Sequence, residues 1–393
     1  MNRESINSFN LTPSRNYSLI SISLCKFLYG FSNLSIAPLL VPMGETFGIG
    51  LETLSLVFAF NSLGQIIIVF FVGFFADKLG RKIFHITFVL LMILLSIAFI
   101  FANNYASFLM LFLLLGIFSV SINMMADSSV SDIFKTNRGY YLNIAHIFYG
   151  LGAISAPVVF NAISKVTDDF RTIYIALAVL SIIVMALIIP AKYPPEHDLS
   201  IKAGIIISML KRPRLLLINI FGVVAFGLLA SISGWLPTLF QRSLGASTAI
   251  SNFSASFFWM AAVFGRAAAA LLSRKYKEIS LIKIMNIMVF LLLVISFFLN
   301  DPLLLLIDYL LIGFFIGASP PLVVAYSATI YKKHSNTRVA ITFAAAAIGM
   351  LLIPPLVGVM GEYFAINRVH AFTAVFFFAY IFIFWKVFKG SEQ

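Results

Sequence analysis

The fold is decided by the stretch Gly73-Phe-Phe-Ala-Asp77-Lys78-Leu-Gly80-Arg81-Lys82, in which a dense cluster of charges directly follows a long apolar segment. Basic side chains at the end of an apolar run belong at a membrane surface, where they contact water and lipid headgroups. The two glycines permit a tight turn and close helix approach. The stretch therefore predicts a short turn between two membrane-spanning helices.

The composition also indicates a membrane protein. Of the 393 residues, 61% are hydrophobic and only 11% are charged, and the mean hydropathy is +1.01. The apolar runs are too many and too long to be buried in soluble cores of this size. A single cysteine, Cys25, excludes a disulfide framework and a multi-cysteine metal site.

Runs of about 20 apolar residues, the length that crosses about 30 Å of hydrocarbon, predict an all-α integral membrane protein with twelve transmembrane helices. The predicted spans are 18–42, 53–76, 83–102, 106–131, 139–162, 171–190, 214–240, 247–272, 281–299, 303–330, 337–360 and 370–388. The Pro320-Pro321 and Pro354-Pro355 pairs are expected to kink their helices. Asp308, near the outer end of its span, is expected to be solvated.

A polar segment between spans six and seven divides the chain into two halves. We expect a cytoplasmic tail (1–17), an N-terminal six-helix bundle (18–190), a cytoplasmic linker (191–213), a C-terminal six-helix bundle (214–388) and a cytoplasmic tail (389–393). The halves echo each other weakly: Gly73 and Lys82 correspond to Gly265 and Arg274, which suggests two pseudo-symmetric repeats.

The basic residues are distributed unequally between the two sides. With both termini cytoplasmic, 21 of the 27 Lys and Arg residues fall on the inner side, four on the outer side, and Lys26 and Arg266 within spans. This bias follows the positive-inside rule and explains the net charge of +12 without nucleic acid. We expect a multi-pass protein of the bacterial inner or plasma membrane, with a retained first helix in place of a signal peptide.

The charged stretch, with its spacing G-x-x-x-D-x-x-G-R-K, resembles the signature between the second and third helices of major facilitator superfamily transporters. Three further segments are similar to the fucose-permease-like branch, a group of sugar:proton symporters: 143–153, Ser233-Gly234-Trp235-Leu236-Pro237, and Phe258-Trp259 with Gly265-Arg266. The resemblance implies two bundles that rock about a central site, exposing it alternately to each side. It also implies that Gly73, Asp77, Gly80, Arg81 and Lys82 latch the bundles in the outward-open state.

Ionisable side chains within the spans are candidates for function, because charge in hydrocarbon is costly unless paired or hydrated. Lys26, Asp127 and His146 lie at one predicted depth, roughly 10 to 12 Å from the inner surface at about 1.5 Å per residue. Asn123 and Asn143 extend this layer. Asp127 is the candidate proton carrier, with Lys26 as counter-ion and His146 as relay or solute ligand. A static Lys26–Asp127 ion pair is the alternative.

The second half offers aromatic and small polar groups for solute binding. The candidates are Trp235, Asn252, Trp259, Arg266 and Tyr326. Trp235 could instead anchor at the membrane interface, and Arg266 could extend toward the inner loop. Arg266 together with Lys26 would favour an anionic solute.

Other chemistry is not indicated. The sequence contains no Walker loop, no H-E-x-x-H and no G-x-S-x-G, so we expect no enzyme, no metal and no cofactor. The prediction is a functional monomer that moves a small polar solute, a sugar or related metabolite, by alternating access and proton symport. The alternatives are a proton-coupled drug or metabolite efflux antiporter and a carrier for an anionic solute.

Overall fold

A computed structural model describes residues 13–69, 71–72, 79–134, 138–193, 208–273, 275–330 and 335–364. Gly73, Asp77 and Arg274 lie outside the described residues, as does the span predicted at 370–388. Asn143 lies in a helix, but its side chain is not among those described.

Helices account for nearly all of the first half. They are α2 (Pro13–Leu34), α3 (Ile36–Phe47), α4 (Leu51–Val69), α6 (Arg81–Phe101), α7 (Tyr105–Ile133), α8 (Arg138–Ile163) and α9 (Ile173–Ile188), the last preceded by a 3-10 turn, Phe170–Thr172. Helices α2 and α3 together form the first predicted span and are separated at Ser35. Pro38 causes this break, because it has no N–H to donate to the Leu34 carbonyl one turn earlier.

The second half repeats this construction. It contains α11 (Pro213–Thr238), which ends in a π turn (Leu239–Ser243), α12 (Thr248–Leu272), α13 (Glu278–Ser296), α14 (Pro302–Gly317), α15 (Ser319–Ile330) and α16 (Ser335–Tyr363). The predicted span 303–330 is divided at Ala318, two residues before the Pro320-Pro321 pair. Pro354 and Pro355, in contrast, lie inside the continuous helix α16.

The described helices have the length and polarity of membrane spans. Within the described residues, ten helical segments are long and apolar enough to cross a membrane, and α14 is a shorter apolar helix. Their outward faces carry exposed apolar side chains such as Leu90, Leu94 and Ile183, as expected of helices surrounded by lipid. The predicted all-helical membrane fold is therefore confirmed.

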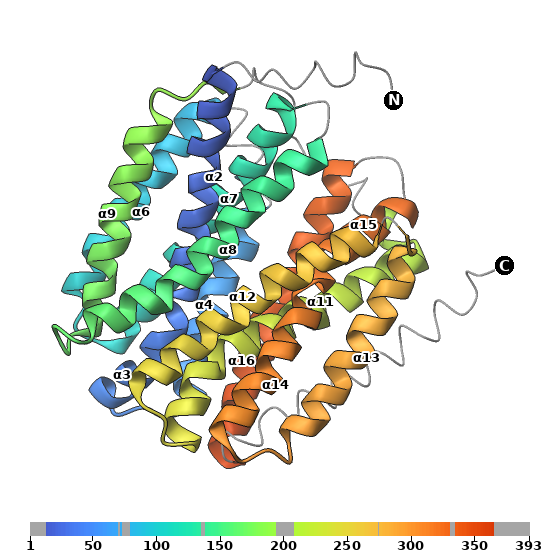
Figure 1. Ribbon diagram of the computed structural model, residues 1–393. Coiled ribbons are helices and arrows are strands. Elements are labelled where there is room, and N and C mark those ends of the chain that lie inside the picture. The colour runs from blue at the N-terminus through green and yellow to red at the C-terminus, as the bar shows by residue number, and fades with distance from the viewer. Residues whose placement is uncertain are drawn as a thin grey trace.

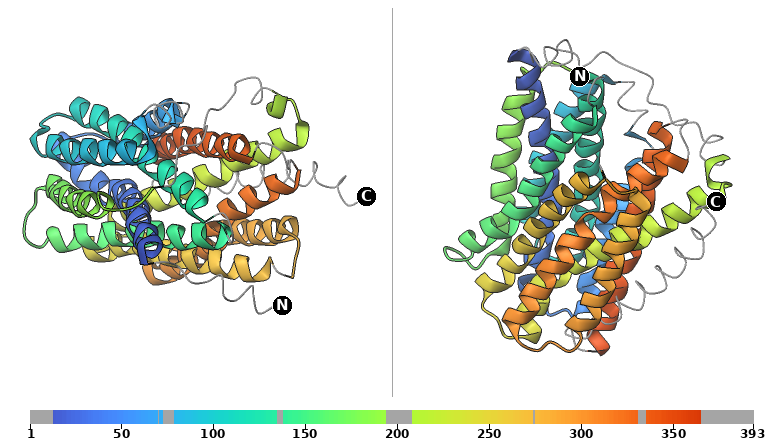
Figure 2. Two further views of the ribbon diagram at one scale, coloured as in Figure 1. Left: turned by 90° about the horizontal axis from the view of Figure 1, so that it is seen from above. Right: turned by 45° about the vertical axis from the view of Figure 1, so that its right-hand side comes forward.

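Close helix pairs recur in both halves. In the first half α2 packs on α8 and α4 on α7; in the second, α11 packs on α16 and α12 on α14. Figures 1 and 2 show the helices of the first half, blue to green, gathered on one side, and those of the second half, yellow-green to red, on the other. Contact between the halves runs along α4 with α16 and α8 with α12.

Asp308 corrects an expectation. Its position near the outer end of its span predicts exposure to solvent, but Asp308 on α14 is only 4% exposed. Its Oδ2 atom has no hydrogen-bond partner among the described residues. The next residue, Tyr309, is also buried, so this turn of α14 faces the helix bundle and not the membrane surface.

Candidate functional site

A buried charged cluster joins α2 and α7. The Nζ atom of Lys26 donates to Asp127 Oδ1 at 2.6 Å and to Asn123 Oδ1 at 2.9 Å. Asn123 and Asp127 are four residues apart on α7 and therefore share one helix face. The Lys26 side chain is completely buried, so its charge depends on these two oxygen acceptors for stabilisation.

His146 of α8 completes the cluster on its accessible side. Its Nε2 atom lies 3.6 Å from Asp127 Oδ1, slightly beyond hydrogen-bond distance, and its side chain is 43% exposed. Asp127 is 21% exposed, whereas Lys26 is not exposed at all. The structure thus brings together Lys26, Asn123, Asp127 and His146, and the groups that water or a solute can reach are the carboxylate and the imidazole.

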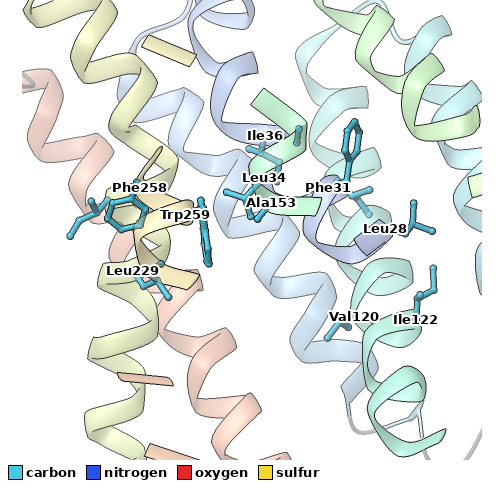
Figure 3. Close-up of a cluster of buried hydrophobic side chains, with 14 of the residues drawn as sticks. Leu28, Phe31, Leu34, Ile36, Val120, Ile122, Ala153, Leu229, Phe258 and Trp259 are labelled. Atoms are coloured by element: carbon cyan, nitrogen blue, oxygen red, sulfur yellow. The ribbon is translucent and has the colours of Figure 1, made fainter. Parts of the chain in front are cut away.

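Arg266 of α12 connects the two halves. Its Nε atom donates to the Gly317 carbonyl at 2.9 Å, and its Cζ lies 5.5 Å from the ring centroid of Trp259 and 5.8 Å from that of Tyr149. Tyr149 belongs to α8, so the guanidinium contacts an aromatic ring from the opposite half. Figure 3 shows Trp259 on α12 extending toward the segment of α8 that carries Ala153. Arg266 therefore points to the interface between the halves and not to the inner loop.

A network of amide side chains that the sequence did not predict lies in the first half, on α2 and α4. Gln65 Nε2 donates to Asn61 Oδ1 at 2.8 Å and to Asn33 Oδ1 at 3.3 Å. Asn33 also donates to Ser119 Oγ at 3.3 Å, and Asn61 donates to the Phe112 carbonyl. Asn33 is the second-last residue of α2 before the break at Ser35. That broken helix was the one signal that could have indicated the network.

The remaining solute-binding candidates occupy different environments. Trp235 is buried, donates to the Pro354 carbonyl at 3.0 Å, and packs 5.5 Å from the ring of Phe58, so its N–H is satisfied by protein and the ring faces protein instead of lipid. Asn252 and Trp259 each have a buried nitrogen without a partner among the described residues. Tyr326 is half-buried on α15.

The described part of the signature stretch, residues 79–82, includes a charged contact with α7. Gly80 adopts φ +77°, a left-handed conformation that suits glycine, and α6 begins directly after it. Arg81 is buried and pairs with Asp132 of α7 at 2.5 Å. Both partners belong to the first half. In this conformation Arg81 is thus paired within its own half, and the expected latch between the bundles in the outward-open state stays a prediction.

The two halves meet near the ends of helices that the charge distribution assigns to the outer side. The backbone N–H of Leu51, at the start of α4, donates to Glu362 Oε2 near the end of α16 at 2.6 Å. Farther along, Ser256 of α12 donates to the Ile154 carbonyl of α8 at 2.9 Å. Among the described residues, no group of three His, Cys, Asp or Glu side chains could hold a metal ion.

Two bundles of membrane-length helices, with a charged cluster inside the first and Arg266 at the contact between them, are the arrangement expected of a membrane transporter. The family model of the Major Facilitator Superfamily matches residues 22–307, and the chain belongs to this superfamily. It is a multi-pass membrane transporter and not an enzyme.

Relatives of known function are distant. The glucose/mannose transporter GlcP of Bacillus subtilis (strain 168) is 22% identical over 345 residues, which cover 84% of this chain and 85% of GlcP. Among solved structures, a D-xylose-proton symporter aligns with a TM-score of 0.82 at 14% identity, over 95% of this chain and 98% of the other. A bacterial homologue of the lysosomal transporter Spinster, in an inward-facing and occupied conformation, aligns with a TM-score of 0.80 at 15% identity, over 97% and 98% of the two chains. At these identities the solved structures establish the fold alone.

Proposed function

We propose that this transporter takes up a sugar or a closely related small polar solute by proton symport, as a member of the fucose-permease-like branch. The observation that carries the proposal is the accessible carboxylate of Asp127, held by Lys26 at 2.6 Å and flanked by His146 at 3.6 Å. A membrane-embedded carboxylate that solvent can reach is suited to carry a proton through a transport cycle.

The charge balance of the cluster gives protonation a structural consequence. With Asp127 ionised, its charge offsets that of Lys26. A proton on Asp127 removes this offset and leaves Asn123 as the remaining acceptor for Lys26. Because an unpaired buried cation is unfavourable, protonation favours a rearrangement of α2 against α7. We infer that this rearrangement couples proton binding to the change of access.

The amide network supports a solute rich in hydroxyl groups. Asn33, Asn61 and Gln65 lie on α2 and α4, and carboxamides can both donate to and accept from sugar hydroxyls. The relative GlcP, named as a glucose/mannose transporter, matches this chemistry. We therefore assign Asn33 and Gln65 to solute binding together with Asn123, Asn143 and His146, and treat Asn252, Trp259, Arg266 and Tyr326 as candidates from the second half.

Uptake into proteoliposomes tests the proposal. The full chain is reconstituted and offered radiolabelled D-glucose, D-mannose, D-xylose and D-gluconate with the exterior more acidic than the lumen. We expect at least one of these solutes to accumulate above its external concentration, and a protonophore to abolish the accumulation. Accumulation only when the lumen is the acidic side would indicate antiport, and a pH gradient without effect on any of the four would contradict proton symport of this class of solute.

A further inference from the structure

Arg266 is a charged group inside a membrane span without an acidic partner. Among the described residues, ion pairs engage Lys26, Arg81, His146 and Arg171 but not Arg266. Its one hydrogen bond within the described part of the chain uses Nε, which donates to the Gly317 carbonyl at 2.9 Å. The two Nη groups, which form the outer fork of the guanidinium, have no acceptor among the described residues.

The surroundings leave this charge uncompensated. Asp127 already offsets Lys26 across 2.6 Å. Arg266 brings a second positive charge toward this cluster, because its guanidinium lies over the ring of Tyr149, three residues from His146 on α8. A second cation near Lys26 is unfavourable unless an anion joins the site, because opposite charges within about 4–6 Å are what stabilise such groups.

The aromatic side chains fix the guanidinium without neutralising it. Trp259 and Tyr149 pack edge to face, with centroids 5.6 Å apart and planes at 83°, and Arg266 lies over both rings. Arg266 covers one face of each ring. This packing also holds a planar fork of N–H donors whose geometry matches a carboxylate in a bidentate pair.

We propose that the transported solute carries a carboxylate that binds the Nη groups of Arg266, as in an aldonate or uronate sugar acid. The inference rests on the proposed function, since it names the class of solute that the same site takes. The hydroxyl groups of such an acid would face the amide side chains of the first half, and its carboxylate would face the second half. A solute bound in this way joins the halves by an ion pair on one side and hydrogen bonds on the other.

Binding to the purified full chain tests the inference. Thermal stabilisation is measured with sodium D-gluconate and sodium D-galacturonate, with D-glucose and D-galactose as uncharged counterparts, and with sodium chloride at matched ionic strength. We expect a sugar acid to stabilise the wild type at a concentration at least about tenfold lower than its uncharged counterpart, a factor that corresponds to about 1.4 kcal/mol. Arg266→Gln should remove this preference, and Arg266→Lys should retain part of it, because lysine keeps the charge but not the fork.

Arg214→Gln serves as the matched control, since Arg214 is an exposed residue of α11 and its loss changes the net charge equally. If Arg266→Gln does not fold, the inference is tested by comparing the preference for sugar acids in the wild type with that in Arg266→Lys. Uncharged sugars that bind as well as their acids overturn the inference and leave the proposed function intact. The inference also fails if the preference for acids survives Arg266→Gln. If neither class stabilises the protein or is taken up by proteoliposomes, the proposed function fails with it.

Discussion

At the scale of single residues, the Lys26–Asp127 ion pair can be explained as a structural contact or as part of the transport mechanism. A buried ion pair is weak evidence for stability, because desolvation of the two charges offsets much of their attraction. It can fix the packing of α2 on α7, or it can bind and release a proton during transport. The exposed edge of Asp127 beside His146 favours the second explanation, since a purely structural pair has no need of solvent access.

Separate and combined removal of the two charges distinguishes these explanations. Lys26→Met alone leaves Asp127 without its cation, and we expect it to destabilise the protein by about 3–5 kcal/mol. Lys26→Met combined with Asp127→Asn removes both charges and should recover most of this loss, as measured by thermal unfolding in detergent. The double variant should still fail to accumulate solute. Full proton-driven accumulation by the double variant would show that the pair is structural.

The sequence predicted which charged side chains lie together where the distance of each residue from its helix end could be counted. Lys26, Asp127 and His146 lie on three helices, and counting residues from the helix ends placed them in one layer, where the structure also brings them together. Asn33 and Gln65 were missed because an amide within an apolar helix shows no pattern in sequence that reveals the side it faces. Asp308 was expected to be exposed to solvent but is buried, and the cause is the same. The distance of a residue from a helix end does not specify which way its side chain faces.

At the scale of helices, glycines make the close backbone contacts of α2 with α8 and of α11 with α16. A Cβ on Gly30 would lie 2.2 Å from the Tyr149 carbonyl oxygen, and one on Gly152 would lie 2.1 Å from that of Phe27. Adding 197 to the numbering carries Gly30 and Gly152 onto Gly227 and Gly349, which make the same kind of contact between α11 and α16.

Gly116 of α7 and Gly313 of α14 are related by the same offset and also lie against the backbone of a neighbouring helix. Gly265 contacts the Phe314 carbonyl as Gly64 contacts that of Leu113. Each half therefore brings its paired helices together at glycines.

A single methyl group should test this packing. Gly152→Ala would place Cβ 2.1 Å from a backbone oxygen that cannot move aside, so α2 and α8 must separate, at a cost of about 1–3 kcal/mol. Gly222→Ala is the control, because its Cβ would find no atom closer than 3.9 Å and alanine favours a helix by about 1 kcal/mol. We expect a lower midpoint of thermal unfolding for Gly152→Ala alone. Equal midpoints for the two variants would contradict this description of the α2–α8 contact.

Helix continuity was only partly predictable. The Pro320-Pro321 pair marked the division between α14 and α15, but the identical Pro354-Pro355 pair lies inside an unbroken α16, and the break at Ser35 was not predicted. Proline removes one hydrogen bond wherever it occurs. Whether the helix then bends or continues depends on neighbouring helices and side chains that compensate for the lost bond, and these contacts are tertiary.

At the scale of the whole molecule, the halves are joined near the ends assigned to the outer side. Glu362 accepts from the first free N–H of α4, where a carboxylate also interacts favourably with the helix dipole. A Cβ on Gly50 would lie 2.5 Å from a Glu362 carboxylate oxygen, so a larger residue there would require this side chain to move. We interpret this conformation as inward-facing, which also accounts for the pairing of Arg81 with Asp132 within its own half.

Removal of the Glu362 contact should shift the balance between conformations. Loss of a helix-capping side chain costs about 1 kcal/mol, which corresponds to roughly a fivefold change in the ratio of inward-facing to outward-facing molecules. Spin labels at Lys192 and Lys275, in a background with Cys25→Ser, measure the separation of the inner ends by double electron–electron resonance. We expect Glu362→Ala to raise the fraction with a short separation. An unchanged distribution would show that this contact does not hold the outer side closed.

Proton coupling through Asp127 is the central claim, and Asp127→Asn tests it most directly. The measurement compares proton-driven accumulation with solute exchange at equal pH in the same proteoliposomes. The account predicts that Asp127→Asn abolishes accumulation against a gradient while exchange persists, because asparagine retains the shape and hydrogen-bonding capacity of the side chain but does not take up a proton. Accumulation that survives in Asp127→Asn would contradict the account.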